Sequence, residues 1–276
     1  MNISALHKLT NLQQRFITGI LGGAAIVFCL VFNEWTYLFF VLVLSVMGQV
    51  EFYGLIKEDG DDPLTKWGIL NGVLLNLISY FVAKDHLPTK TYLIFFVLLG
   101  VIYISELYRK SPNPFENIAY TIVGVFYVAM PFALLHFATF SQGKFSYQIA
   151  SGIFFLLWAS DSGAYFAGKA FGKNKLFPRI SPGKTWEGFI GGGVASLAIA
   201  VVLSFYFIDL PLWKWACLSV IIVITGTYGD LIESMLKRSL FVKDSSTLIP
   251  GHGGILDRFD GLLMAAPFVA FFLMWI

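Results

Sequence analysis

Residues 189–208 read FIGGGVASLAIAVVLSFYFI and contain no charged side chain. A helix of about 20 apolar residues is what the hydrocarbon core of a bilayer, about 30 Å thick, requires. The whole 276-residue chain has the same character, because 57% of its residues are hydrophobic, only 13% are charged and the mean hydropathy is +0.73. A soluble domain normally carries about 25% charged residues. The chain is therefore predicted to be an integral membrane protein.

Similar apolar runs recur along the chain, separated by short polar segments such as EDGDDP at 58–63 and SPNP at 111–114. The length and pattern of these runs predict an all-α, polytopic helical membrane protein with about nine transmembrane helices. No internal repeat divides the chain, so we expect a single membrane domain over 1–276, with an N-terminal helical bundle over 1–145 and a catalytic half over 146–276. The predicted spans are 16–32, 35–56, 67–83, 90–107, 116–140, 147–170, 185–208, 212–239 and 259–276.

Lys and Arg are divided unevenly between the two ends of these spans. With a cytoplasmic N-terminus, fifteen of them fall on the cytoplasmic side and four on the opposite side. Because short loops rich in Lys and Arg stay in the cytoplasm, we expect a multi-pass protein of the cell (inner, cytoplasmic) membrane with a cytoplasmic N-terminus and an external C-terminus. Both long polar loops, 171–184 and 240–258, then lie in the compartment that holds nucleotides.

Charged side chains interrupt the apolar runs in the second half of the chain. Asp161 lies inside the sixth run, and Asp230, Glu233, Ser234 and Lys237 lie near the end of the eighth run at i, i+3, i+4 and i+7. That spacing places the four on one helical face. Charged groups at membrane depth are costly, so they usually face a polar cavity and mark a functional site. The plainer interpretations are a lone structural hydrogen bonder at Asp161 and a surface ion pair of Lys237 with a neighbouring carboxylate.

Asp257 and Asp260 open the ninth run three residues apart and also share a helical face. The helix dipole alone favours carboxylates at a helix N-terminus, which is the plainer interpretation of this pair. Carboxylates gathered with hydroxyl groups, and with little histidine, make an oxygen-rich site that suits Mg²⁺ better than zinc. The second half of the chain therefore predicts a magnesium site.

Groups that bind phosphate flank these carboxylates. The run PGHGG at 250–254 lets backbone N–H groups approach phosphate oxygens, and nearby Lys and Arg side chains neutralise their charge. In the loop ISPGKTWEG at 180–188, Ser181 fits a helix N-cap and Pro182 fits the first helical position. We therefore expect the seventh span to begin at this loop and to point its N-terminus at an anion.

Residues 234–260 read SMLKRSLFVKDSSTLIPGHGGILDRFD. This stretch resembles the signature of the phosphatidate cytidylyltransferase (CDP-diacylglycerol synthase) family, S-x-x-K-R-x4-K-D followed by H-G-G and D-R-x-D. DSGAYF at 161–166 and SPGKTWEG at 181–188 are also similar to the family, and the resemblance covers about 150–276. It implies the reaction phosphatidate + CTP → CDP-diacylglycerol + pyrophosphate, with Mg²⁺, in phospholipid biosynthesis. It also implies a helical membrane fold, often as a homodimer.

The resemblance implies a role for each matching position. The nucleophile is already an anionic phosphate, so no dedicated general base is needed, and metal ions with Lys and Arg groups act by positioning and electrostatics. Catalytic roles are expected for Asp230, Asp257, Lys237 and Asp260. Asp230 and Asp257 are expected as the first metal ligands, with Asp260, Asp244 and Asp161 next. Substrate-binding residues are expected to be Ser181, Lys184, Ser234, Arg238, Lys243, His252, Gly253, Gly254 and Arg258.

Two other functions stay open. The first is another CTP-using lipid enzyme, such as a polyprenol kinase or a CDP-archaeol synthase, and the full pattern over 234–260 argues against the kinase. The second is a secondary transporter, but transporters show internal repeats and sites near the bilayer midplane, whereas these charges cluster at one end of the spans. CTP and phosphatidic acid are the expected substrates, the lipid bilayer is the expected surrounding, and no nucleic-acid partner is expected.

Overall fold

The computed structural model describes residues 11–242, 245–246 and 253–276, with side chains described from residue 19 onward. Long helices account for most of this structure, and two short strands pair as an antiparallel hairpin. The elements are α2 (Asn11–Phe32), α3 (Glu34–Glu58), α4 (Thr65–Ala83), the 3-10 helix η1 (Thr89–Leu93), α5 (Ile94–Leu107), α6 (Pro114–Gly124), the π-helix η2 (Val125–Ala129), α7 (Met130–Thr139), α8 (Tyr147–Phe171), β1 (Lys175–Phe177), β2 (Ser181–Thr185), α9 (Trp186–Tyr206), α10 (Leu212–Ser239) and α11 (Leu256–Trp275).

Each predicted span coincides with a helix, or with a continuous series of helices, in the described residues. Seven of these helices are long and apolar enough to cross a membrane, and α2 adds a shorter apolar stretch, Gly19–Phe32. α8 is also long, but its second half carries Asp161 and Lys169. The prediction of an all-α, polytopic membrane protein is confirmed, and the count of nine spans is approximate.

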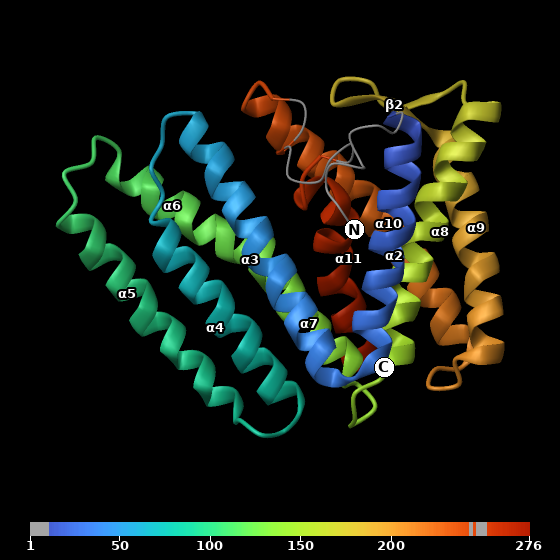
Figure 1. The fold of residues 1–276 in the computed structure, drawn as a ribbon, viewed down its shortest axis with the longest axis horizontal. Helices are drawn as coiled ribbons and strands as arrows, with labels where there is room; N and C mark the ends of the chain where they lie inside the picture. The colour runs from blue at the N-terminus through green and yellow to red at the C-terminus, as the bar shows by residue number, and fades with distance from the viewer. Residues whose placement is uncertain (1–10, 243–244, 247–252) are drawn as a thin grey trace.

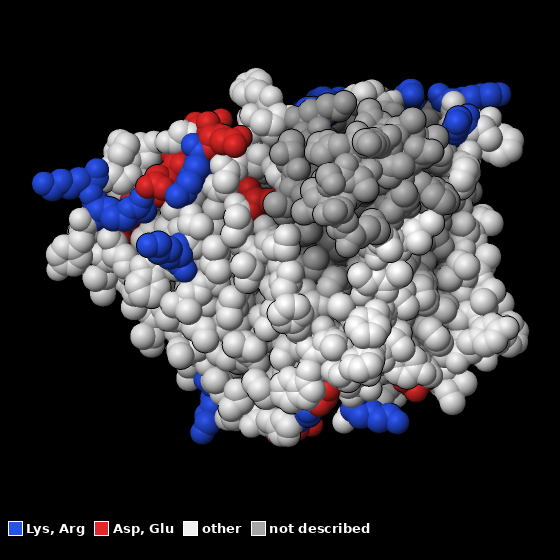
Figure 2. Space-filling view, in the orientation of Figure 1, with Lys and Arg blue, Asp and Glu red and all other residues white. Residues whose placement is uncertain are grey.

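The helices run between two ends of the molecule (Figure 1). The α3–α4, α5–α6 and α8–α9 connections lie at the upper end in that view, whereas the α4–α5, α7–α8 and α9–α10 connections and the C-terminus lie at the lower end. Figure 2 shows the charged side chains gathered at these two ends, with a broad uncharged band between them. This distribution is what a bilayer requires of a protein that spans it.

The boundary between α2 and α3 is set by Asn33. Its side-chain oxygen accepts hydrogen bonds from the backbone N–H groups of Trp35 and Thr36, both at 2.9 Å, and the Thr36 hydroxyl accepts one from the Asn33 N–H at 3.2 Å. These reciprocal bonds satisfy donors that a helix N-terminus leaves without partners. The two apolar runs are therefore separate helices that meet at a tight turn.

The core lies where α3, α7, α8, α10 and α11 meet, and it is filled by large side chains such as Phe52, Phe132 and Trp215. On one side of this core, α8 and α9 pack closely through small residues. A Cβ atom added at Gly163 would lie 2.5 Å from the Ala195 Cβ and 2.7 Å from the Gly191 carbonyl oxygen, so only glycine fits there. Small residues let helix backbones approach each other in this way. The close packing holds the polar half of α8 against the start of α9.

Candidate active site

One cavity in the described structure is lined by carboxylates and basic groups together. It has a volume of about 660 Å³ and receives residues from α8, the hairpin, α9, α10 and α11. The hairpin lies at the upper end of the molecule in Figure 1. Residues from three separate stretches of the sequence, represented by Asp161, Lys184 and Asp230, therefore meet at one polar cavity. The charged residues that line it are Asp161, Lys169, Lys184, Asp230, Asp257, Arg258 and Asp260.

Asp161 reaches the cavity from α8, at the point where the side chains of this helix change from mostly buried to exposed. Between Ile149 and Leu157 most side chains are buried, whereas Asp161 and Tyr165 are exposed. Ser146 caps the buried end by accepting a hydrogen bond from the Ile149 N–H at 3.0 Å. The helix is therefore anchored at its buried end and presents its polar end to the cavity.

The hairpin brings Lys184 to the cavity. Its ammonium nitrogen lies 2.6 Å from Oδ2 of Asp230 on α10. Glu187, in the first turn of α9, holds the base of the hairpin by accepting hydrogen bonds from the Lys173 N–H at 3.1 Å and from the Asn174 side chain at 2.7 Å. The pairing of β1 with β2 holds the Lys184 backbone, and the ion pair with Asp230 holds its side chain.

The prediction that Ser181 caps the seventh span, with Pro182 at its first position, is wrong. Ser181 lies in β2, where it pairs with Phe177, and α9 begins only at Trp186. A residue that precedes proline disfavours the helical region, which favours the extended conformation at Ser181. Thr185 is the N-cap, and its hydroxyl accepts a hydrogen bond from the Gly188 N–H at 3.1 Å.

The predicted face of α10 is confirmed. The Ser234 hydroxyl donates to Oδ1 of Asp230 at 3.4 Å, and the Lys237 ammonium lies 2.6 Å from Oε2 of Glu233. The same ammonium lies 2.6 Å from Oδ1 of Asp257. The plainer interpretation, a surface ion pair of Lys237 with a neighbouring carboxylate, is right about the partner Glu233 but wrong about the surface, because both side chains are mostly buried. Lys237 also reaches a second helix. This three-residue ion cluster joins α10 to the start of α11.

Asp257 uses both carboxylate oxygens to organise the segment before α11. Oδ1 pairs with Lys237, and Oδ2 accepts hydrogen bonds from the Ser245 N–H at 3.0 Å, the Ser245 hydroxyl at 2.9 Å and the Gly254 N–H at 2.9 Å. Oδ2 thus accepts three hydrogen bonds, whereas Oδ1 contacts Lys237 alone and keeps an acceptor position. Asp257 therefore anchors this segment, and a metal ion would reach it at Oδ1.

Glu51 of α3 is a second buried anchor, and it comes from the N-terminal half. The residue is 7% exposed, and its carboxylate accepts hydrogen bonds from the Ser246 hydroxyl at 2.7 Å, the Ile255 N–H at 2.8 Å and the Leu256 N–H at 2.9 Å. The Ser245 hydroxyl, which donates to Asp257, lies 3.3 Å from the Glu51 carboxylate. Sequence reasoning missed Glu51, although a carboxylate within the apolar run 35–56 was a visible signal.

The carboxylates of the cavity fit Mg²⁺ if they supply only some of its ligands. Among the described residues, no three His, Cys, Asp or Glu side chains lie close enough to hold a metal ion by themselves. Asp161, Asp230 and Asp260 line the same cavity. Mg²⁺ is usually held through one or two carboxylates plus substrate phosphates, and it keeps several waters. The donor set fits an ion that arrives with a polyphosphate.

A model of the cytidylyltransferase family matches residues 13–276. The chain belongs to this family. It is 32% identical over 273 residues to the phosphatidate cytidylyltransferase of Bacillus subtilis, covering 96% of this chain and 98% of that relative. It is also 52% identical over 133 residues to the phosphatidate cytidylyltransferase of Haemophilus influenzae, which is 45% of each chain. With the enzyme of Staphylococcus haemolyticus it shares 41% identity over 173 residues, 62% of this chain and 64% of the relative. The resemblance predicted from 234–260 is confirmed.

Not every residue of the family signature lines the cavity. Arg238 is exposed and its guanidinium donates to the Val242 carbonyl at 3.3 Å. Ser181, Ser234 and Lys237 are not part of the lining either, although Ser234 contacts Asp230 and Lys237 contacts Asp257, which are. Their substrate-binding and catalytic roles stay predictions. The predicted residues that lie outside the described part of the chain are Lys243, Asp244 and His252.

The glycines of the cytidylyltransferase signature have a packing role in this structure. Gly253 has φ +78°, and a Cβ there would lie 2.7 Å from Oδ2 of Asp257. A Cβ at Gly254 would collide with the Ser245 hydroxyl and with the Glu51 carboxylate. The Gly254 N–H is already given to Asp257. These glycines let two buried carboxylates approach the backbone, so the predicted phosphate contact at Gly254 requires a rearrangement of that bond.

Proposed function

We propose that the polar cavity transfers the cytidylyl group of CTP to phosphatidic acid, giving CDP-diacylglycerol and pyrophosphate for phospholipid biosynthesis. One observation carries the proposal: Asp161, Asp230 and Asp260 line the same cavity as Lys184 and Arg258. Basic side chains bind phosphate oxygens, and clustered carboxylates bind the cation that accompanies a nucleoside triphosphate. The chain is a nucleotidyltransferase that belongs with relatives named for this reaction.

The reaction needs charge neutralisation more than proton transfer. An oxygen of the phosphatidate phosphomonoester attacks the α-phosphorus of CTP, and the bond between that phosphorus and the bridging oxygen of the β-phosphate breaks. Pyrophosphate leaves with the electron pair of the broken bond. A phosphomonoester is already largely dianionic at neutral pH, so no side chain has to remove a proton. The cavity lowers the barrier by holding two anions together and by stabilising charge on the leaving group.

Lys184 and Arg258 are the basic groups in position to bring the anions together. Lys184 pairs with Asp230 at 2.6 Å, and this pairing holds its ammonium over the cavity before substrate binds. Arg258 reaches the cavity from the first turn of α11. Its planar guanidinium can donate two parallel hydrogen bonds to one phosphate. Basic groups from separate elements in one cavity suit a reaction between two phosphate groups.

Mg²⁺ is the proposed cofactor, held by Asp230 and Asp260 with Asp161 beside them. When bound, it neutralises the triphosphate and polarises the bond that breaks. Asp257 stays a predicted ligand, and its described contacts support a positioning role through Lys237 and the Gly254 N–H. Lys237 in turn is held between two carboxylates. For Asp257 and Lys237 these contacts support a positioning role at the N-terminus of α11, and the predicted catalytic role stays a prediction.

We further propose that the protein lies in the inner, cytoplasmic membrane with its N-terminus in the cytoplasm and its C-terminus outside. The proposal is supported by the fifteen-to-four division of Lys and Arg between the two ends. It is also supported by the position of the hairpin, at the same end as the α3–α4 and α5–α6 connections (Figure 1). The cavity then opens where CTP is available. Assembly as a homodimer stays a prediction.

Product analysis tests the proposed activity. Purified protein in detergent micelles is given Mg²⁺, labelled phosphatidic acid and CTP, and we expect labelled CDP-diacylglycerol with one equivalent of pyrophosphate. A polyprenol kinase would form CDP and a phosphorylated polyprenol instead, and a CDP-archaeol synthase would prefer the ether-linked lipid. Absence of any CTP-dependent lipid product would contradict the proposal and favour the alternative of a secondary transporter.

A further inference from the structure

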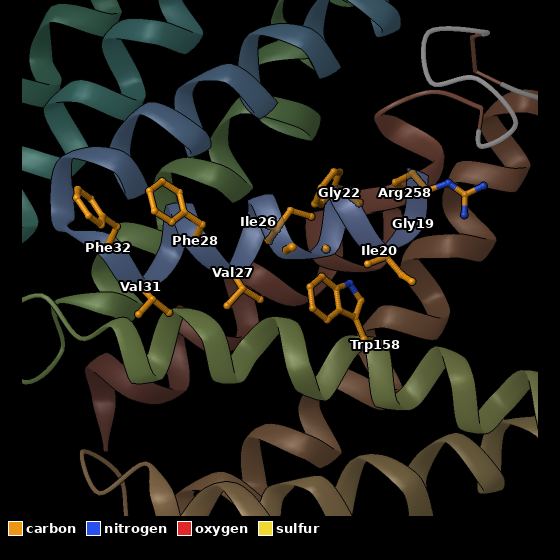
Figure 3. A pocket seen from close by; sticks show the side chains of 13 residues that line it. Gly19, Ile20, Gly22, Ile26, Val27, Phe28, Val31, Phe32, Trp158 and Arg258 are labelled. Atoms are coloured by element: carbon orange, nitrogen blue, oxygen red, sulfur yellow. The ribbon is translucent and has the colours of Figure 1, made fainter. Parts of the chain in front are cut away.

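A long apolar groove runs along α2, separate from the polar cavity over most of its length. It has a volume of about 960 Å³ and is lined by α2 residues from Gly19 to Phe32, by Trp158 of α8 and by Arg258 and Phe259 of α11. Figure 3 shows the α2 residues spread along the groove, with Trp158 and Arg258 both near its Gly19 end. Among the described residues that line it, Arg258 alone is charged.

The groove and the polar cavity meet at two side chains. Trp158 and Arg258 line both hollows. The groove is therefore apolar along its length and basic at the end that adjoins the candidate active site. A ligand with an anionic head and apolar tails matches this arrangement, because its head enters the polar cavity while its tails lie along α2.

The groove follows most of the apolar part of α2. Residues 19–32 extend about 20 Å along the helix axis at 1.5 Å per residue. This is more than half of a hydrocarbon core about 30 Å thick, so the groove has room for an acyl chain along its length. Gly22 and Gly23 leave it open, because a Cβ at either position would meet no atom within 4 Å.

We propose that this groove is the acyl-chain site for an anionic diacyl phospholipid whose phosphate binds Arg258. The proposal rests on the proposed function, in which that lipid is the phosphatidate substrate. Lipid tails are as apolar as the groove, so binding there gains little from the hydrophobic effect. The groove instead fixes the lipid in one orientation, with its phosphate at the edge of the cavity, and this reduces the entropy lost on reaching the reactive geometry. Arg258 supplies the preference for an anionic headgroup.

Filling the groove tests the proposal. Gly23→Leu places a large side chain in open space, and leucine is a better helix former than glycine, so the helix is not weakened. In mixed micelles with dioleoyl phosphatidate, we expect the KM for the lipid to rise about tenfold, equivalent to about 1.4 kcal/mol, while the KM for CTP is unchanged. Dihexanoyl phosphatidate, with short tails, should show a smaller increase.

The matched control is Gly100→Leu. Gly100 lies in α5, outside the groove, and a Cβ there also meets no atom within 4 Å. It should leave both KM values unchanged. The groove assignment is overturned if Gly23→Leu behaves like this control, or if its effect is equal for long and short acyl chains.

Photolabelling gives a readout that does not depend on turnover. Phosphatidate with a diazirine near the end of one acyl chain should label the segment 19–32, and unlabelled phosphatidate should compete while phosphatidylcholine should not. Equal labelling by a phosphatidylcholine probe would show that the groove holds bilayer lipid without selecting a headgroup, which would overturn the proposal. Labelling confined to other helices would overturn it as well. Selective labelling of 19–32 without formation of CDP-diacylglycerol would refute the proposed function and leave the groove assignment standing.

Discussion

Glu51 in α3 accepts a 2.9 Å hydrogen bond from the backbone N–H of Leu256, 205 residues further along the chain. The adjacent Ile255 N–H donates to the same carboxylate at 2.8 Å. The first N–H groups of a helix have no partners within it, and a negative charge there also complements the helix dipole. Glu51 therefore caps α11 from another helix. Because Asp257 and Arg258 follow in the same turn, an N-terminal helix fixes the position of residues that line the polar cavity.

Replacement of Glu51 by glutamine should reduce both stability and turnover. The amide keeps one acceptor oxygen but turns an NH₂ group toward donors, and each lost hydrogen bond to a charged group is worth about 1.5–3 kcal/mol. We expect kcat to fall at least tenfold and the thermal midpoint in detergent to fall. Glu51→Asp keeps the charge and should recover part of kcat.

Glu58→Gln is the matched control, because Glu58 lies exposed at the end of the same helix. It should leave kcat and the thermal midpoint unchanged. A Glu51→Gln protein with normal kcat would show that α11 keeps its position without this carboxylate.

The spans and the face of α10 could be predicted because both follow from local rules. Apolar runs of membrane length and i, i+3, i+4, i+7 spacing need only neighbouring residues. The partner of Glu51 could not be predicted in this way, since it lies about 200 residues away and no local pattern links the two. The hairpin was missed because SPGKT at 181–185 lacks the alternation of apolar and polar residues that indicates a strand.

The cavity itself was predictable in part. The cost of a charge at membrane depth indicates that Asp161 and Asp230 face a polar space, and the structure places both in one cavity. The contacts of Asp257 were not predictable, because sequence alone cannot show that its oxygens accept bonds from Lys237, Ser245 and Gly254. Burial and hydrogen bonding, and not residue type, distinguish a carboxylate that anchors the fold from one that is available to bind a metal ion or substrate.

Lys184→Gln should impair substrate binding and also disturb α10. The variant removes a cation from the cavity and leaves Asp230 without its partner at 2.6 Å. We expect kcat/KM for CTP to fall about 100-fold, about 2.7 kcal/mol. Lys175→Gln is the control, since Lys175 lies exposed in β1 of the same hairpin and does not line the cavity.

A double-mutant cycle separates the two roles of Lys184. Asp230 and Lys184 contact each other. The effects of Asp230→Asn and Lys184→Gln on kcat/KM should therefore be coupled by about 0.5–3 kcal/mol. Strictly additive effects on kcat/KM would show that the ion pair is incidental to the reaction.

Reporter fusions should place the hairpin in the cytoplasm. The expectation follows from the fifteen-to-four division of Lys and Arg. Fusions within 171–184 and 240–257 should report a cytoplasmic position, and a C-terminal fusion should report an external one. A reporter in either loop that is accessible from outside would reverse the topology and remove the cavity from the compartment that holds CTP.

Asp257→Asn tests the carboxylate at the centre of the site. The substitution keeps size but removes the charge that pairs with Lys237 and turns an NH₂ group toward the Ser245 and Gly254 donors. We expect CTP-dependent formation of CDP-diacylglycerol to fall by about two to three orders of magnitude, with normal expression and membrane insertion. Lys110→Gln, an exposed charge in another loop, should change little, because isolated surface charges contribute little.

A Mg²⁺ titration separates anchoring from metal binding at Asp257. Anchoring alone predicts that the loss in Asp257→Asn is independent of metal concentration, since the contacts with Lys237 and Ser245 are lost at every concentration. Asp260→Asn, which removes a carboxylate that lines the cavity, should instead regain activity as Mg²⁺ is raised or replaced by Mn²⁺, which accepts similar oxygen ligands. Recovery of Asp257→Asn under the same conditions would add metal binding to its anchoring role. Near-normal activity of Asp257→Asn at all metal concentrations would show that neither role supports the reaction.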